Sequence, residues 1–238
     1  MAIDDDLPLP VVNFLNAIGV PWPYFNEGTV RQFASLVREF RQAVQTTHGQ
    51  ATGAVAAIAR AYQSVSAERM QSGWERLSGH VGDLIAGCTV LADVLDMAAG
   101  YIVAQKAAAI AELVGMAAAF FADQAASVAT LGLAEAAAPA IVWGARKLME
   151  SLVMDLQQYV IGMVIETAAK PLFAKVAALA EALAGPNWAQ SGTAAGKPTG
   201  VSLYPDVVRA QTRALRGHAA ALRAHAAVFQ EGVRRLSF

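Results

Sequence analysis

The sequence has too little cysteine for a disulfide framework, because its 238 residues include only Cys88. A single thiol also excludes a zinc site built from several cysteines. Charge is scarce as well, since Asp, Glu, Lys and Arg make up 16% of the chain and the formal net charge is −1. Apolar residues make up 55%, which is enough to bury a large core. With so little charge on the chain, a membrane or a large partner protein must be considered, and the net charge does not help to choose between them.

Long uninterrupted apolar runs are absent too. The N-terminus carries Asp4, Asp5 and Asp6 where a Sec-type signal requires positive charge, so we expect export by that route to be excluded. The uncharged stretch from Leu7 to Asn26 is broken by four prolines, and charged residues recur through the later apolar segments. A membrane span needs about 18 consecutive apolar residues. The pattern therefore favours a buried interior over a span, with membrane contact left open.

Two heptad patterns predict a pair of long helices. In the first, residues seven apart are of one chemical type: Val30, Val37, Val44, Ala51, Ile58 and Val65, with Phe33, Phe40, Thr47, Ala54 and Ala61 at the companion position. In the second, apolar residues alternate steps of three and four: Trp74, Leu77, Val81, Leu84, Cys88, Leu91, Leu95, Ala98 and Ile102. Such seams bury against partner helices. Thr29 followed by Gln32 predicts a capping box, and Ser64 and Ser66 predict the turn between the helices.

We therefore predict an all-α fold built on a long antiparallel hairpin, 30–64 against 67 to about 106, and elaborated into an Ala-rich helical bundle. Residues 107–183 indicate further apolar helices, with a first turn at Pro139 and a kink or division at Pro171. The predicted organisation is a helical domain over 1–184, a flexible linker or loop over 185–203, and a C-terminal helix over 204–238 packed on the bundle.

No catalytic, cofactor or metal site is predicted. The segment 191–198 departs from a phosphate-binding loop in the position of its first glycine and in Pro198, which replaces Ser or Thr. His218 and His225 are seven residues apart, about 10 Å along a helix, which is too far to share a zinc ion. Cys88 lies on the second seam and is expected to be a core residue. Arginines make the last helix basic, and a solvated or salt-bridged face is favoured there over nucleic-acid binding.

Two segments carry a resemblance to a known family. Trp74, near the turn of the hairpin, resembles the tryptophan of the WXG superfamily of type VII (ESX) secretion substrates, although the Trp-X-Gly tripeptide itself is absent. The segment with Pro21, Trp22 and Pro23, which precedes the first long helix, resembles the opening of actinobacterial WXG-like N-terminal domains of the CpnT-like group, found at the front of polymorphic toxins. The last helix, with His218, His225 and Phe229, is similar to the segment that closes such domains.

The resemblance implies an effector-delivery module that docks small Esx-like helical hairpins, with a toxin domain encoded in cis or in trans. It implies a cytoplasmic protein that is then secreted, or held in the cell envelope, through the type VII system. None of the five tyrosines begins the Tyr-x-x-x-Asp/Glu export signal of the superfamily, so recognition by the secretion ATPase is expected to rest on a partner.

We predict two docking faces, both formed by seam residues. The hairpin tip comprises Ile58, Val65, Trp74, Leu77 and Val81, and the second face comprises Val208, Leu215, Leu222 and Phe229. Two alternatives stay open. One is a membrane-active, channel-like module that inserts its Ala-rich helices. The other is a cytoplasmic chaperone or immunity-type protein.

Overall fold

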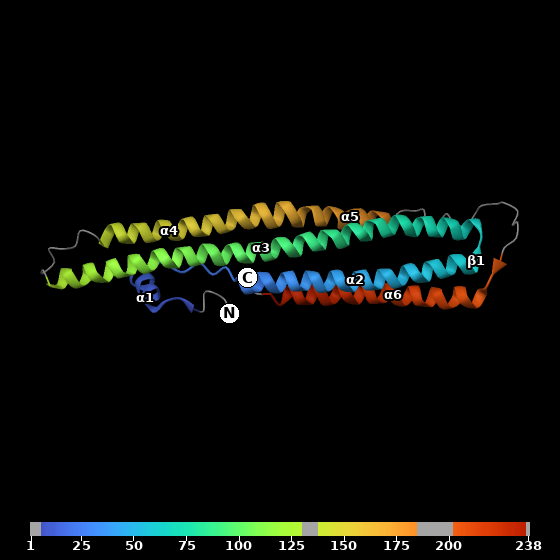
Figure 1. Ribbon diagram of the computed structural model, residues 1–238, viewed down its shortest axis with the longest axis horizontal. Helices are drawn as coiled ribbons and strands as arrows, with labels where there is room; N and C mark the ends of the chain where they lie inside the picture. The colour runs from blue at the N-terminus through green and yellow to red at the C-terminus, as the bar shows by residue number, and fades with distance from the viewer. Residues whose placement is uncertain (1–5, 130–137, 185–201, 237–238) are drawn as a thin grey trace. The chain divides into compact units, whose positions relative to one another are not determined.

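The computed structural model describes residues 6–129, 138–184 and 202–236, and the chain divides into two compact units. Unit 1 comprises Met1–Gln32, Val94–Glu166 and Ser237–Phe238, and unit 2 comprises Phe33–Asp93 and Thr167–Leu236. The elements are α1 (Leu9–Ile18), α2 (Glu27–Ala61), β1 (Tyr62–Gln63), α3 (Val65–Ala129), α4 (Ala138–Tyr159), η2 (Val160–Ala169), α5 (Lys170–Ala184), β2 (Ser202–Leu203) and α6 (Pro205–Arg234) (Figure 1). The prediction of an all-α hairpin bundle is confirmed.

The core of unit 1 is formed by α1 together with the unit 1 parts of α3 and α4. The apolar side of α1 is buried, and Phe14 is fully buried 5.2 Å from the ring of Phe120 on α3. Pro8 precedes α1 and Pro10 occupies its first turn, where a missing N–H needs no partner. Gly19 ends α1 in the left-handed conformation, with φ of 67°, which glycine adopts without a Cβ clash. Pro8 and Pro10, which interrupt the apolar run in the sequence, therefore mark the start of a helix.

The start of α2 differs from the predicted capping box. The helix begins at Glu27, and the Oδ1 atom of Asn26 accepts a hydrogen bond of 3.0 Å from the Thr29 N–H. The prediction that Thr29 caps the helix is therefore wrong, because Asn26 supplies the same oxygen three residues earlier. Thr29 is a buried residue inside the first turn.

In unit 2, α2 and the first part of α3 run antiparallel. The guanidinium of Arg38 donates to the Ala92 carbonyl at 3.5 Å, and that of Arg41 donates to Thr89 Oγ1 at 3.2 Å. Partners three residues later on α2 are thus three residues earlier on α3, as an antiparallel hairpin requires. α2 ends at Ala61, three residues before the predicted end at Ser64. α3 ends at Ala129 and not near Lys106, because it continues through the Ala-rich sequence.

A short strand pair joins the turn of the hairpin to α6. Tyr62 and Gln63 pair with Leu203 and Ser202 in antiparallel register, and the Tyr204 N–H donates to the Ala61 carbonyl at 2.9 Å. The hydroxyl of Ser64 accepts from the Ala67 N–H at 3.1 Å and so caps α3, as its position in the sequence predicted. The backbone bonds from 202–204 fix where α6 begins.

From this anchor α6 lies along α2 in unit 2 (Figure 1). The ring of Phe229 lies 6.4 Å from Phe33 and 5.0 Å from Phe40, and the ring of His225 lies within hydrogen-bond distance of Thr47, at 3.1 Å. Gly232 permits this approach, because a Cβ there would meet Leu36 Cδ2 at 2.7 Å. The companion stripe of the first heptad pattern therefore contacts α6.

Later helices follow the predicted proline positions. Pro139 lies in the first turn of α4, and α5 begins at Lys170, immediately before Pro171, after the π-helical stretch η2. The predicted linker at 185–203 lies outside the described residues except for β2. Within the described residues one helix, Val65–Ala126 in α3, is long and apolar enough to cross a membrane by length and composition, and half of its most apolar window is buried. Charged residues recur along this helix, among them Lys106 and Glu112, and the preference for a buried interior over a span stays a prediction.

Candidate partner-docking surface

The residues predicted for the hairpin tip differ in how much surface they offer. Ile58 is buried at 5% exposure, while Val65, the first residue of α3, is 57% exposed. Leu77 and Val81 are half-buried on α3. The tip therefore leaves more than half of Val65, and a smaller part of Leu77 and Val81, accessible to a partner.

Trp74 bridges α3 to α2 within unit 2. Its indole N–H donates to Thr52 Oγ1 at 3.1 Å, and its ring stacks on His48 with centroids 5.3 Å apart and planes 16° apart. The side chain is half-buried. These contacts give Trp74 a role within the hairpin, in addition to the docking role predicted for it.

The stacking of His48 on Trp74 predicts a pH-dependent stability. Burial lowers the pKa of His48 below its ordinary value of 6.5, so the folded chain favours the neutral imidazole. The stability contribution is complete above pH 6.5 and is lost as the pH falls through the lowered pKa of the folded state. Urea denaturation between about pH 7.5 and about pH 5 should show a decrease in the free energy of unfolding that His48→Phe reduces. Equal pH profiles for the two proteins would contradict this origin.

The second predicted face packs on α2 in part, through Phe229. Val208, Leu215 and Phe229 are half-buried, and the contacts of Phe229 with Phe33 and Phe40 are within this chain. Leu222 is 37% exposed. The heptad seam of α6 thus packs in part on α2 and in part remains accessible.

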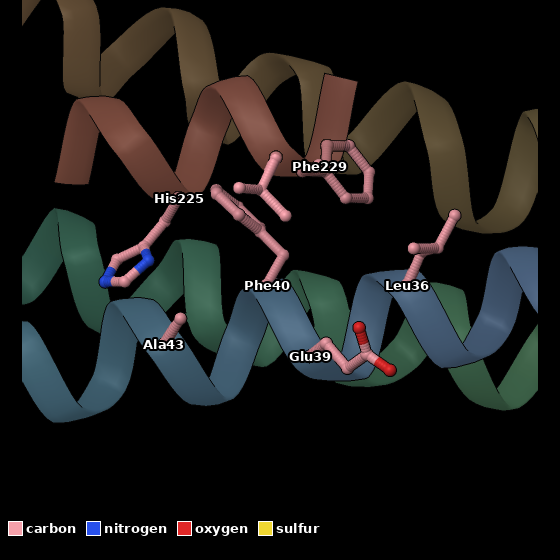
Figure 2. A pocket seen from close by; sticks show the side chains of 7 residues that line it. Leu36, Glu39, Phe40, Ala43, His225 and Phe229 are labelled. Carbon is pink, nitrogen blue, oxygen red and sulfur yellow. The ribbon is translucent and has the colours of Figure 1, made fainter. Parts of the chain in front are cut away.

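A cavity of about 150 Å³ lies where α2 and α6 meet. Its lining comes from both helices: Leu36, Glu39, Phe40 and Ala43 from α2, and His225, Val228 and Phe229 from α6. Figure 2 shows Phe40 and Phe229 side by side between Leu36 at one end and His225 at the other. Val228 on its wall is 69% exposed. A cavity of this volume between two adjacent helices has room for one apolar side chain from a third helix.

In the segment Pro21, Trp22 and Pro23, which carries the family resemblance, the central residue is part of the protein core. Trp22 is buried at 6% exposure and belongs to the core of unit 1, while Pro21 is exposed and Pro23 is half-buried. The segment therefore holds the connection between α1 and α2 against the core.

Sequence reasoning missed a buried ion pair in unit 1. The ammonium of Lys106 lies 3.3 Å from the Glu27 carboxylate and donates to the Phe25 carbonyl at 2.8 Å, and both charged side chains are at most 1% exposed. The signal was present, because Lys106 follows Ile102 by four residues and so continues the buried stripe of α3. The pair ties the connection before α2 to α3.

Chemistry-bearing groups are few in the part of the chain that the structure describes. No three His, Cys, Asp or Glu residues there could hold a metal ion together. Cys88 is buried at 3% exposure, and burial raises the pKa of its thiol against the opposing effect of the Arg41 charge. A thiol with a raised pKa is a poor nucleophile. Cys88 fits the predicted core role.

This geometry defines the chain as a helical-hairpin bundle. Its residues 5–146 match the model of the WXG100-like domain, and the chain belongs to that family. The family consists of helical proteins associated with type VII secretion, is not a known enzyme class, and is exported without a signal peptide. WXG100 proteins typically form dimers of helical hairpins. No curated protein and no solved structure matched the chain.

Proposed function

We propose that this chain is a delivery module of a type VII secreted effector and that it docks small Esx-like helical hairpins. The observation that carries the proposal is the open apolar cavity between α2 and α6, beside the exposed Val228. One wall of the cavity is α2, a helix of the hairpin that the family match covers, and members of the family typically pair as helical hairpins. An accessible apolar cavity beside a helical hairpin therefore supports docking of a second hairpin.

In this mechanism a partner helix places one apolar side chain into the cavity. A void of about 150 Å³ accepts a group the size of benzene, so a single aromatic or branched aliphatic side chain would fill it. Phe40 and Phe229 would supply apolar contact, and an anchor of this kind contributes much of the binding energy of a helix in a groove. Val65, Leu77 and Val81 at the tip, and Leu222 on α6, would extend the contact.

Filling the cavity provides the test. Ala43→Leu adds a branched side chain to the cavity wall, so we expect the affinity for a co-expressed small Esx-like hairpin to fall about tenfold or more, measured by calorimetric titration. The matched control is Ala86→Leu, at an exposed position on α3 outside the cavity. Equal affinities for the two variants would refute the cavity as the docking site.

Export tests the delivery role separately. The full chain should accumulate in culture filtrate only when the type VII secretion ATPase is active, in fusion or in complex with a toxin domain. Retention in the cell lysate whether the ATPase is active or inactive would instead support the cytoplasmic chaperone or immunity-type role.

A membrane-active module is the second candidate, and one observation favours it. The length and composition of Val65–Ala126 would permit a span, and α3 exposes small apolar residues together with Met97, Val114 and Phe121. Leakage of dye from liposomes on addition of the chain would support insertion. Intact liposomes together with tight hairpin binding would leave docking as the function.

A further inference from the structure

Basic charge in unit 2 is concentrated on α6. Among the described residues, unit 2 holds thirteen Lys and Arg against eight Asp and Glu, while unit 1 holds four against eight. The near-neutral net charge of the chain therefore hides opposite charges on its two units. α6 alone carries five arginines, no lysine, and two acidic residues.

The five arginines share one side of the helix. Arg209, Arg213, Arg216, Arg223 and Arg234 follow one another at steps of four, three, seven and eleven, which places them in one stripe at 3.6 residues per turn. All five are exposed. The side chains that contact α2, His225 and Phe229, lie on the opposite side of α6. The arginine stripe therefore extends over about 38 Å of the helix, densest between Arg209 and Arg223.

Most of this stripe has no acidic partner. Asp206 pairs with Arg209 at 3.4 Å, and Glu231 pairs with Arg235, just after the helix, at 3.0 Å. Within the residues that the structure describes, Arg213, Arg216, Arg223 and Arg234 form no ion pair. Like charges three or four residues apart destabilise a helix, whereas an ordinary solvated face mixes both signs. An opposing anionic surface would relieve this repulsion.

The chemistry of the stripe favours carboxylates carried on a helix. Guanidinium groups bind carboxylates in a bidentate way and are more weakly hydrated than ammonium groups, which suits an interface. Recurrence near seven-residue steps matches a helix lying alongside α6. A lipid surface fits less well, because the apolar side of α6 faces α2 and so is not free to enter a bilayer interface. A nucleic acid fits less well, because no aromatic side chain lies among the arginines of the stripe for bases to stack on.

We propose that the arginine stripe of α6 is the docking face for an acidic helix of a partner protein, with carboxylates repeating at about the seven-residue spacing of the arginines. This inference rests on the proposed docking function and specifies the charge of the partner. It adds a second contact, separate from the cavity and on another side of α6, which would fix the orientation of the bound partner.

The test uses two synthetic helical peptides of about four heptads. In the first, Glu occupies two adjacent positions of the helix surface in every heptad, and in the second, Gln replaces each of these Glu residues. Fluorescence anisotropy would measure their binding to the full chain and to Arg213→Gln/Arg216→Gln/Arg223→Gln. The control, Arg60→Gln/Arg69→Gln/Arg76→Gln, removes the same charge from exposed arginines elsewhere in unit 2.

We expect the Glu peptide to bind at least about tenfold more weakly to the α6 triple variant than to the control, and more weakly as NaCl rises from about 50 to about 200 mM. Equal binding of the Gln peptide, or equal losses in both variants, would overturn the inference. Tighter, stripe-dependent binding of duplex DNA or of vesicles rich in anionic phospholipid would overturn it as well.

Binding of the Esx-like hairpin separates this inference from the docking function. If the hairpin binds the triple variant normally but does not bind Ala43→Leu, this inference fails and the docking function stands. If the hairpin binds neither the wild type nor the variants, the docking function itself fails.

Discussion

Lys106→Met is expected to lower the free energy of unfolding by about 3–5 kcal/mol, since removal of one member of a buried ion pair leaves an uncompensated charge. Glu27 is 1% exposed and would lose the ammonium 3.3 Å away, and the Phe25 carbonyl would lose a donor at 2.8 Å. Denaturation by guanidinium chloride, followed by tryptophan fluorescence, would measure the change.

Matched variants separate this effect from the general loss of a lysine. Lys147 pairs with Glu150 at 3.2 Å, but both side chains are more than half exposed, so Lys147→Met should cost at most about 1 kcal/mol. Glu27→Gln/Lys106→Met removes both charges and should recover part of the loss. If the two single lysine variants have the same stability, the pair at Lys106 does not hold the segment before α2.

Phe14→Ala is expected to cost about 3–5 kcal/mol, because a fully buried phenyl ring leaves a cavity that its neighbours fill only in part. Its ring lies 5.2 Å from Phe120, so the variant also loses an aromatic contact between α1 and α3. The same denaturation experiment applies.

Leu9→Ala on the same helix is the control for this prediction. Leu9 is 70% exposed, so its truncation should change the stability by no more than about 0.5 kcal/mol. Similar losses from Phe14→Ala and Leu9→Ala would show that α1 does not belong to the core of unit 1.

The long hairpin could be predicted because its signal is local and repeated. Val37, Val44 and Ile58 recur at the heptad period, and all three are buried. A heptad period indicates that one side of a helix is apolar, and each further repeat strengthens that indication. Its ends were less predictable: α3 continues to Ala129 because alanine is a strong helix former and needs no seam.

The helix that packs against a heptad seam could not be predicted in the same way. The stripe through Val208, Leu215 and Phe229 indicated a partner helix, and part of that role is taken by α2 of the same chain, where Phe229 meets Phe40. A heptad pattern specifies an apolar side but not whether the covering helix is intramolecular. The docking role of the accessible remainder, including Leu222, stays a prediction.

The ion pair between Glu27 and Lys106 and the pairing of β1 with β2 were missed for a different reason. The first joins residues 79 apart in the sequence, and the second involves only two residues on each strand. The position of Lys106 on the buried stripe is periodic, but the choice of partner in either case is not, because it is specified by the tertiary fold. α1 was missed because prolines near a helix start look the same in sequence as prolines that interrupt one.

Light scattering of the purified complex tests the central claim most directly. The full chain of 24.9 kDa, co-expressed with a small Esx-like hairpin of a type VII locus, should elute at the summed mass of the two chains. Ala43→Leu should return it to 24.9 kDa, while Ala86→Leu should leave the complex intact. A wild-type chain that elutes at 24.9 kDa beside the free hairpin would contradict the account.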